Sequence, residues 1–285
     1  MRVNVYSDKF SGTLSAAEVL KVIKSVFKNF DIQANYFPVT DGGEHSTEIF
    51  KHYNIQTESV SMKKDFVGSW IPAEYLNING DVYFESASLI GVNKTSEHPF
   101  NLNTAALSQV IPEIDVLGLG GSKTVDGGIG LLSCLGIDFY AEEEMITNPK
   151  PKDFKDITAV KVNDSFSNLE LKVLTDTSTR LLGSNSAVAM YGPQKGLNKK
   201  EIKHLEEQLE RIFQIVSTEL NVPLDPFKKE TGAAGGLSFV LGEILGCELI
   251  SGSQYFLEQT NLKNKIKQKE ITVVCEGTFD MTSLS

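Results

Sequence analysis

The sequence of 285 residues predicts an α/β fold with two domains. Strand and helix patterns alternate over residues 3–53, whereas closely spaced strands follow from about residue 57. Glycine-rich turns come directly after several of these strands. The length also exceeds what one hydrophobic core usually serves, which favours two domains.

The opening strand and helix are defined by their flanking residues. Residues 3–6 form a short apolar strand that leads to Asp8. Ser15 and Glu18 have the spacing of a capping box, and apolar side chains recur behind them at helical spacing. We therefore expect an amphipathic helix that runs to about Asn29.

A second strand and helix repeat this unit. Residues 33–39 predict a strand that leads to the turn Asp41-Gly42-Gly43, and residues 44–53 predict a helix. Such β-α-β-α alternation is typical of a doubly wound parallel sheet of the Rossmann or flavodoxin-like kind. Ligands of such sheets bind where strands end and helices begin, which is where Asp8 and Asp41 lie.

The middle of the chain predicts a second α/β domain with a mixed sheet. Residues 59–62, 71–76 and 82–86 read as strands joined by short turns, one of them over residues 79–81. Residues 104–111 predict a helix.

The most informative segment is the glycine-rich turn at residues 118–128, with the sequence Gly-Leu-Gly-Gly-Ser-Lys-Thr-Val-Asp-Gly-Gly. A strand over residues 114–119 runs into it and a helix over residues 129–135 follows. Glycines let backbone N–H groups approach a ligand, and the helix N-terminus adds a positive dipole end. The turn therefore predicts a binding place for an anion.

The rest of the chain completes both predicted domains. The remaining predicted elements are a surface loop over 142–156, a strand over 169–174, helices over 199–219 and 235–244, and a strand over 271–274. We expect the doubly wound domain to comprise residues 1–60 and 262–285, and the mixed-sheet domain to comprise residues 61–261.

Composition excludes several classes of function. The formal charge is −10 and the pI about 5.0, which argues against a nucleic-acid-binding surface. No apolar run is long enough to span a bilayer, and the N-terminus reads as a strand rather than a signal peptide. The widely spaced Cys134, Cys247 and Cys275 suit reduced thiols in a cytoplasm, not a zinc site.

Acidic residues recur at the ends of predicted strands and in the glycine-rich turns. They are Asp8, Asp41, Glu44, Asp126, Asp176, Glu276 and Asp280. Each one alone fits a helix cap or a turn, but together they supply the oxygen ligands that Mg²⁺ prefers and groups that can accept a proton. Lys195 lies between glycines and could reach a phosphate, or it could be a solvated lysine in a turn.

Six motifs, in order along the chain, resemble those of bacterial glycerate kinases of the two-domain, non-P-loop kind. They lie at residues 7–16, 41–44, 120–128, 191–196, 232–237 and 275–280. The resemblance implies two α/β domains with the site in the cleft between them. It also implies ATP-dependent phosphorylation of D-glycerate, usually at the 2-hydroxyl group, with ATP and Mg²⁺ as cofactors.

The resemblance, read with the strand-end acids, implies a role for each candidate residue. The catalytic candidates are Asp8, Asp41 and Asp176. The candidates for phosphate or nucleotide binding are Gly120, Gly121, Ser122, Asp126, Gly127 and Lys195. The substrate or cleft-wall candidates are Lys9, Glu44, Glu276 and Asp280. The magnesium candidates are Asp8, Asp41 and Asp126.

The sequence also departs from the family pattern. Ser11 stands at the family's lysine, Val125 and Thr179 at asparagines, and Thr278 at an arginine. Lys9, Lys123, Lys195 and Arg180 are the candidates to compensate for these positions. The sequence ends soon after the last motif, whereas the family continues. A degenerate member that binds a ligand or partner without chemistry is therefore the alternative hypothesis, and a homodimer is compatible with either.

Overall fold

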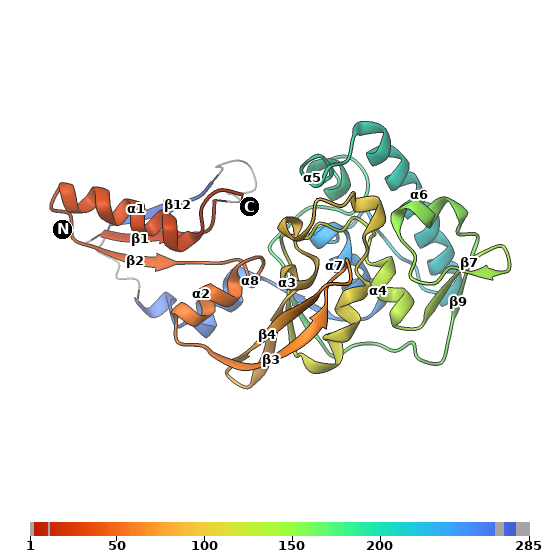
Figure 1. Ribbon diagram of the computed structural model, residues 1–285, viewed down its shortest axis with the longest axis horizontal. Coiled ribbons are helices and arrows are strands. Elements are labelled where there is room, and N and C mark those ends of the chain that lie inside the picture. The colour runs from red at the N-terminus through yellow and green to blue at the C-terminus, as the bar shows by residue number, and fades with distance from the viewer. Residues whose placement is uncertain (1–2, 11, 266–270, 278–285) are drawn as a thin grey trace.

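The computed structural model describes residues 3–10, 12–265 and 271–277, and it confirms an α/β fold with one parallel and one mixed sheet (Figure 1). A small sheet lies at one end of the elongated molecule, and a larger body lies at the other. Helices α2 and α8 lie between them.

The small sheet is parallel and has the order β12-β1-β2. Its elements are β1 (Val3–Ser7), β2 (Ala34–Pro38), β12 (Ile271–Cys275) and helix α1 (Ala16–Asn29). Ser7 pairs with Pro38 on one side and with Cys275 on the other, so the carboxyl ends of all three strands meet at one edge. The predicted capping box is confirmed, because Ser15 and Glu18 exchange hydrogen bonds at the start of α1.

The larger sheet has six strands in the order β11-β10-β6-β5-β4-β3. The strands are β3 (Gln56–Lys64), β4 (Trp70–Ile78), β5 (Asp81–Glu85), β6 (Val116–Gly118), β10 (Lys172–Leu174) and β11 (Glu248–Ile250). The pairs β3–β4 and β4–β5 are antiparallel, and the other neighbours are parallel. The predicted mixed sheet is therefore confirmed.

Two predictions for the middle of the chain were wrong. The segment predicted as a loop over 142–156 contains β8 (Glu144–Met145) and a 3₁₀ helix over Pro151–Asp156. With β7 (Ile137–Ala141) and β9 (Ala159–Val162), β8 forms a third, antiparallel sheet. The helix predicted at 104–111 is two 3₁₀ turns, Ala105–Gln109 and Ile111–Glu113, because Pro112 cannot continue an α-helical hydrogen-bond ladder.

The other helices surround the two main sheets. The α-helices are α2 (Ser46–His52), α3 (Ala87–Ile90), α4 (Ile129–Cys134), α5 (Ala187–Lys195), α6 (Lys199–Leu220), α7 (Leu237–Phe239) and α8 (Gly252–Gln259). Further 3₁₀ turns are Val92–Lys94, Pro99–Asn101, Ala233–Gly235 and Lys263–Lys265, and a π-helical turn spans Val240–Ile244. Helices α5 and α8 and strands β7, β9 and β11 were not predicted.

Helices α2 and α8 form an apolar layer that joins the small sheet to the larger one. Phe50 of α2 is fully buried and packs against Tyr83 of β5, with ring centroids 5.1 Å apart. Phe50 also packs on Phe256 of α8, at 5.6 Å, and one buried cluster contains these rings together with Tyr6 of β1. The layer therefore fixes the two sheets relative to each other. The predicted domain boundary at residue 61 stays a prediction, although β3 already begins at Gln56.

Two glycine-rich loops contact each other where the sheets meet. A Cβ added at Gly118 would lie 2.0 Å from the Gly42 carbonyl oxygen, and one at Gly43 would lie 2.9 Å from the Leu119 carbonyl oxygen. Backbone therefore packs directly on backbone, which only glycine permits. In the described part of the chain, no helix is both long and apolar enough to cross a membrane.

We expect the substitution Gly118→Ala to destabilise the protein by about 2 kcal/mol or more, because its methyl group would overlap the Gly42 carbonyl group. The matched control is Gly242→Ala, whose methyl group would meet only the Leu249 side chain at 3.0 Å or beyond. Thermal unfolding of the two variants measures the difference. Equal melting temperatures would contradict the close contact of the two loops.

Candidate active site

Acidic residues gather at the carboxyl edge of the small sheet, around one lysine. Asp8 directly follows β1, and Asp41 lies three residues beyond β2. The Lys9 ammonium nitrogen lies 3.8 Å from Asp8 Oδ2 and 3.8 Å from Asp41 Oδ1. Glu276 directly follows β12, and its carboxylate also acts electrostatically on Asp8. The structure thus brings together four residues that the sequence analysis selected.

Burial and neighbouring charges change the acidity of this cluster. Burial raises the pKa of Asp8 to about 6, the Lys9 charge opposes this rise, and the Asp41 and Glu276 carboxylates add to it. Burial alone would lower the pKa of Lys9, but nearby carboxylates, led by that of Asp41, outweigh it, and the pKa of Lys9 rises. Asp8 is therefore a better proton acceptor than an ordinary aspartate, beside a lysine that stays charged.

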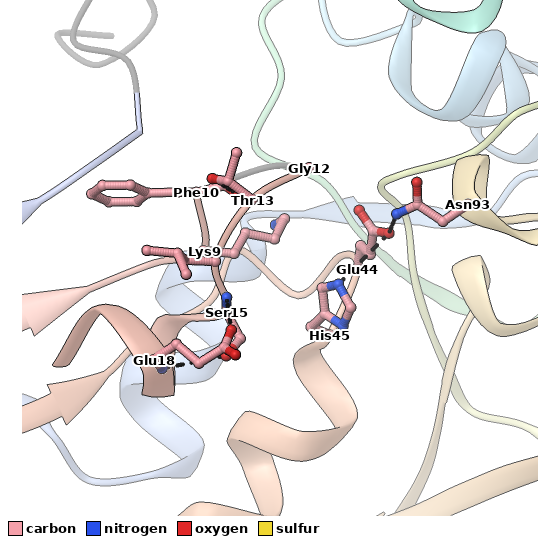
Figure 2. Close-up of a pocket in the computed structure, with 10 residues that line it drawn as sticks. Lys9, Phe10, Gly12, Thr13, Ser15, Glu18, Glu44, His45 and Asn93 are labelled. Carbon is pink, nitrogen blue, oxygen red and sulfur yellow. Dashed lines mark hydrogen bonds and ion pairs between the residues drawn. The ribbon is translucent and has the colours of Figure 1, made fainter. Parts of the chain in front are cut away.

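A cavity of about 310 Å³ opens beside Lys9 (Figure 2). The loop between β1 and α1 forms one wall, and Glu44, His45 and Asn93 form the other. Glu44 Oε1 accepts a hydrogen bond of 3.2 Å from the Asn93 amide and lies 3.7 Å from His45 Nε2. The cavity thus combines a cation with hydrogen-bond donors and acceptors from both sides of the junction between the sheets.

Glu85 positions the loop that carries Asp41 and Glu44. It ends β5, is largely buried, and accepts hydrogen bonds from the backbone N–H groups of His45 (2.8 Å) and Thr47 (3.0 Å). Burial raises its pKa. Sequence reasoning missed Glu85, although it has the same signal as Asp8, an acid at the end of a predicted strand. Asn93 carries no comparable signal.

The glycine-rich segment at residues 118–128 divides into two parts. Its first part packs against a cavity-wall residue, because a Cβ at Gly121 would lie 2.7 Å from the Glu44 side chain. In its second part, Gly127 packs on Leu209 and Gly128 packs on Val240. Gly127, predicted to bind phosphate, is therefore needed there for packing inside the protein.

Asp126 lies in the interior, away from the acidic cluster. It is fully buried, and its Oδ2 accepts hydrogen bonds from the backbone N–H and hydroxyl groups of Thr104 and from the Gly130 N–H group. Among the residues that the structure describes, no group of three or more His, Cys, Asp or Glu side chains could hold a metal ion. The structure therefore does not assemble Asp8, Asp41 and Asp126 into the predicted three-carboxylate magnesium site.

Lys195 and Ser122 also make internal contacts. Lys195 ends helix α5 and is 6% exposed, so the alternative of a solvated lysine in a turn was wrong. Its ammonium group donates a hydrogen bond of 2.8 Å to the Thr124 carbonyl oxygen. The Ser122 hydroxyl group lies 2.7 Å from that of Thr124 and also accepts a hydrogen bond from the Thr124 N–H group.

Asp176 lies in a second cavity, of about 270 Å³. Both of its carboxylate oxygens accept hydrogen bonds of 2.7 Å, one from the Ser251 hydroxyl group and one from the Ser253 N–H group. These bonds hold the start of helix α8. A Cβ at Gly252, between the two serines, would lie 1.8 Å from the Asp41 carbonyl oxygen. Asp176 thus supports the Asp41 loop through α8, and its predicted catalytic role stays a prediction.

The departures from the family pattern fall in different places. Ser11, Thr278 and the candidate Asp280 lie outside the described residues. Val125 is buried, and Thr179 pairs its hydroxyl group with that of Thr177. Of the lysines and arginine named as compensating groups, Lys9 alone is among the residues that line either of the two cavities.

Asp8 and Asp41 suit a magnesium ion that is shared with a phosphate group. Magnesium in phosphoryl-transfer sites is usually held by one or two carboxylates together with phosphate oxygens, rather than by a complete protein cage. The side chains of Asp8 and Asp41 keep 33% and 45% of their surface exposed, so both carboxylates remain accessible to a ligand beside Lys9. Lys9 between them would offer a positive charge to such a phosphate.

Comparison with known proteins identifies the family. A curated glycerate kinase of Halalkalibacterium halodurans is 29% identical over 97% of this chain and 77% of its own length. Glycerate 2-kinase of Escherichia coli K12 is 27% identical over 100% of this chain and 79% of its own length. Both relatives are named as kinases of glycerate.

Two further findings agree. A crystal structure from Salmonella typhimurium LT2, provisionally assigned as glycerate kinase 2, matches with a TM-score of 0.71 at 22% identity, which shows a shared fold. The match covers 100% of this chain and 80% of the Salmonella chain. The sequence profile described as the glycerate kinase family matches residues 3–285. Because that match spans almost the whole sequence, the chain belongs to the glycerate kinase family.

Proposed function

We propose that this protein transfers a phosphoryl group from ATP to D-glycerate and forms 2-phosphoglycerate. The observation that carries the proposal is the position of Lys9, between the Asp8 and Asp41 carboxylates and beside a cavity of substrate size. Phosphoryl transfer needs a group to orient or deprotonate the attacking hydroxyl and positive charge near the phosphate. The names of the curated relatives support glycerate as the acceptor.

Each residue of the cluster has a distinct role in this proposal. Asp8 accepts the proton of the glycerate hydroxyl group, whose oxygen bonds to the transferred phosphorus as the bond from that phosphorus to ADP breaks. Lys9 neutralises negative charge that develops on the transferred group. Asn93 and His45 orient glycerate by hydrogen bonds. Asp41 holds Mg²⁺, which when bound supplies further positive charge to the phosphate oxygens.

A coupled assay of ADP release with D-glycerate tests the activity, and the products identify the acceptor hydroxyl. The phosphorus of 2-phosphoglycerate couples to one carbon-bound proton and that of 3-phosphoglycerate to two, so ³¹P NMR gives a doublet or a triplet. We expect the doublet. Folded protein without turnover, yet stabilised thermally by ATP or glycerate, would instead support the degenerate binding member.

The substitution Asp8→Asn tests the proton acceptor. We expect kcat to fall about 100-fold or more, because an amide cannot accept the proton. The melting temperature at pH 7.5 should not fall, because the raised pKa of Asp8 means that its buried charge opposes folding above pH 6. Asp164→Asn, at an exposed position, is the control for a lost surface carboxylate. Full activity in Asp8→Asn would exclude Asp8 as the base.

The pH dependence follows from the same group. Because only the ionised carboxylate accepts a proton, and burial raises the pKa of Asp8 to about 6, kcat/KM should rise with pH up to about 6 and then level off. Below that pH it should fall about tenfold per pH unit. Initial rates between pH 5 and 8 measure this profile. A flat profile over this range would assign the base to a different, solvated carboxylate with a pKa nearer the ordinary aspartate value of 3.8.

A further inference from the structure

Lys195 is a buried cation to which the proposed reaction assigns no task. Its ammonium group is enclosed at the end of α5 and donates a hydrogen bond of 2.8 Å to the Thr124 carbonyl oxygen. Burial lowers its pKa to about 8. Because an ammonium group is costly to bury, it needs hydrogen bonds and a nearby negative charge to remain in such a place.

Asp126 is the acidic residue that acts electrostatically on Lys195, without an ion pair between these two described residues, and burial raises the pKa of Asp126 itself. Its carboxylate is completely buried, and the charge of Asp126 opposes the effect of burial on Lys195. Three hydrogen bonds reach its Oδ2, whereas within the described part of the chain Oδ1 has no hydrogen-bond partner. Two buried ionisable side chains thus lie behind the glycine-rich segment: Lys195 holds Thr124, and Asp126 holds Gly130 and Thr104.

A continuous set of contacts leads from Lys195 to the cavity. Lys195 holds the carbonyl group of Thr124, and the Thr124 N–H group donates a hydrogen bond of 3.0 Å to Ser122 Oγ. The hydroxyl groups of Thr124 and Ser122 lie 2.7 Å apart. Gly121 follows, at a distance from Glu44 that leaves no room for a Cβ. A shift of Thr124 would therefore displace Gly121, which packs against Glu44 in the wall of the cavity.

We propose that Lys195 is a positioning residue, which fixes Thr124 from behind and thereby sets the position of Ser122 and of Gly121, the residue that packs against Glu44 in the cavity wall. It does so without contact to phosphate. The catalytic consequence rests on the proposed phosphoryl transfer, but the positioning of the segment does not. The two can therefore be tested separately.

Thermal unfolding tests the contact between Lys195 and Thr124. Lys195→Met keeps the volume and removes the charge, and it should lower the melting temperature by about 5 °C or more because the buried Thr124 carbonyl group loses its hydrogen-bond donor. In an Asp126→Asn background the same substitution should lower it by less, since the electrostatic effect of Asp126 on Lys195 is gone. Lys203→Met, at a lysine with 81% of its side chain exposed, is the control and should change little.

Amide hydrogen exchange tests the positioning without any assay of activity. The N–H groups of Lys123 and Thr124 donate hydrogen bonds to Ile90 and Ser122. We expect a peptide covering residues 118–124 to exchange about tenfold faster in Lys195→Met than in the wild type, and unchanged in Lys203→Met. Unchanged exchange in Lys195→Met would overturn the proposal, whatever the enzyme does with glycerate.

A double-mutant cycle with Ser122→Ala distinguishes positioning from direct contact with phosphate. If Lys195 acts through Thr124 and Ser122, Lys195→Met should lower kcat/KM about tenfold. Ser122→Ala should then lower kcat/KM less in the Lys195→Met background than it does in the wild type. If the two substitutions lower kcat/KM independently, so that their factors multiply, and Lys195→Met also raises the melting temperature, Lys195 would instead be a ligand of phosphate. A lowered melting temperature with unchanged kcat/KM would reduce Lys195 to a structural role. An inactive wild type would refute only the proposed function.

Discussion

The contact between two backbone segments determines how the rest of this molecule is arranged. Residues 41–44 follow the small sheet, and residues 118–121 begin at the last residue of β6 in the larger sheet. The backbones of these two segments pack directly on each other. Because neither segment can retreat without separating the sheets, groups from both sheets face one cavity. Lys9 follows β1 of the small sheet, and Asn93 lies in the connection that follows β5 of the larger sheet.

The electrostatics of this junction depend on one lysine among several acids. Asp41, Asp8, Glu44 and Glu85 all raise the pKa of Lys9, while burial raises that of Asp8. An anionic substrate would meet mostly negative charge here if Lys9 acted alone. A divalent cation that binds with the nucleotide would correct this balance, since carboxylates that repel a free phosphate attract one carrying a metal ion. For the proposed phosphoryl transfer, the acidity of the site would favour a metal-bound phosphate donor over a free one.

The sequence predicted the first two strand–helix units and the mixed sheet, because capping residues, hydrophobic periodicity and glycine turns are local signals, but it missed the third sheet and helices α5 and α8. It located Asp8, Asp41 and Glu276 correctly at one edge, since the carboxyl ends of parallel strands share that edge. The sequence could not distinguish the accessible Asp8 from the buried Asp126, because both residues follow a predicted strand. Only tertiary packing encloses Asp126. For the same reason, a lysine between glycines in the sequence gave no sign that α5 would bury it against Thr124.

The aromatic layer of α2 and α8 has a consequence for motion. One cluster includes Tyr6 of the small sheet, Phe50 and Phe256 of the two helices, and Tyr83 of the larger sheet. A hinge rotation of one sheet away from the other would pull these rings apart and expose apolar surface, at about 25 cal/mol for each Å². The sheets are therefore expected to keep their relative orientation.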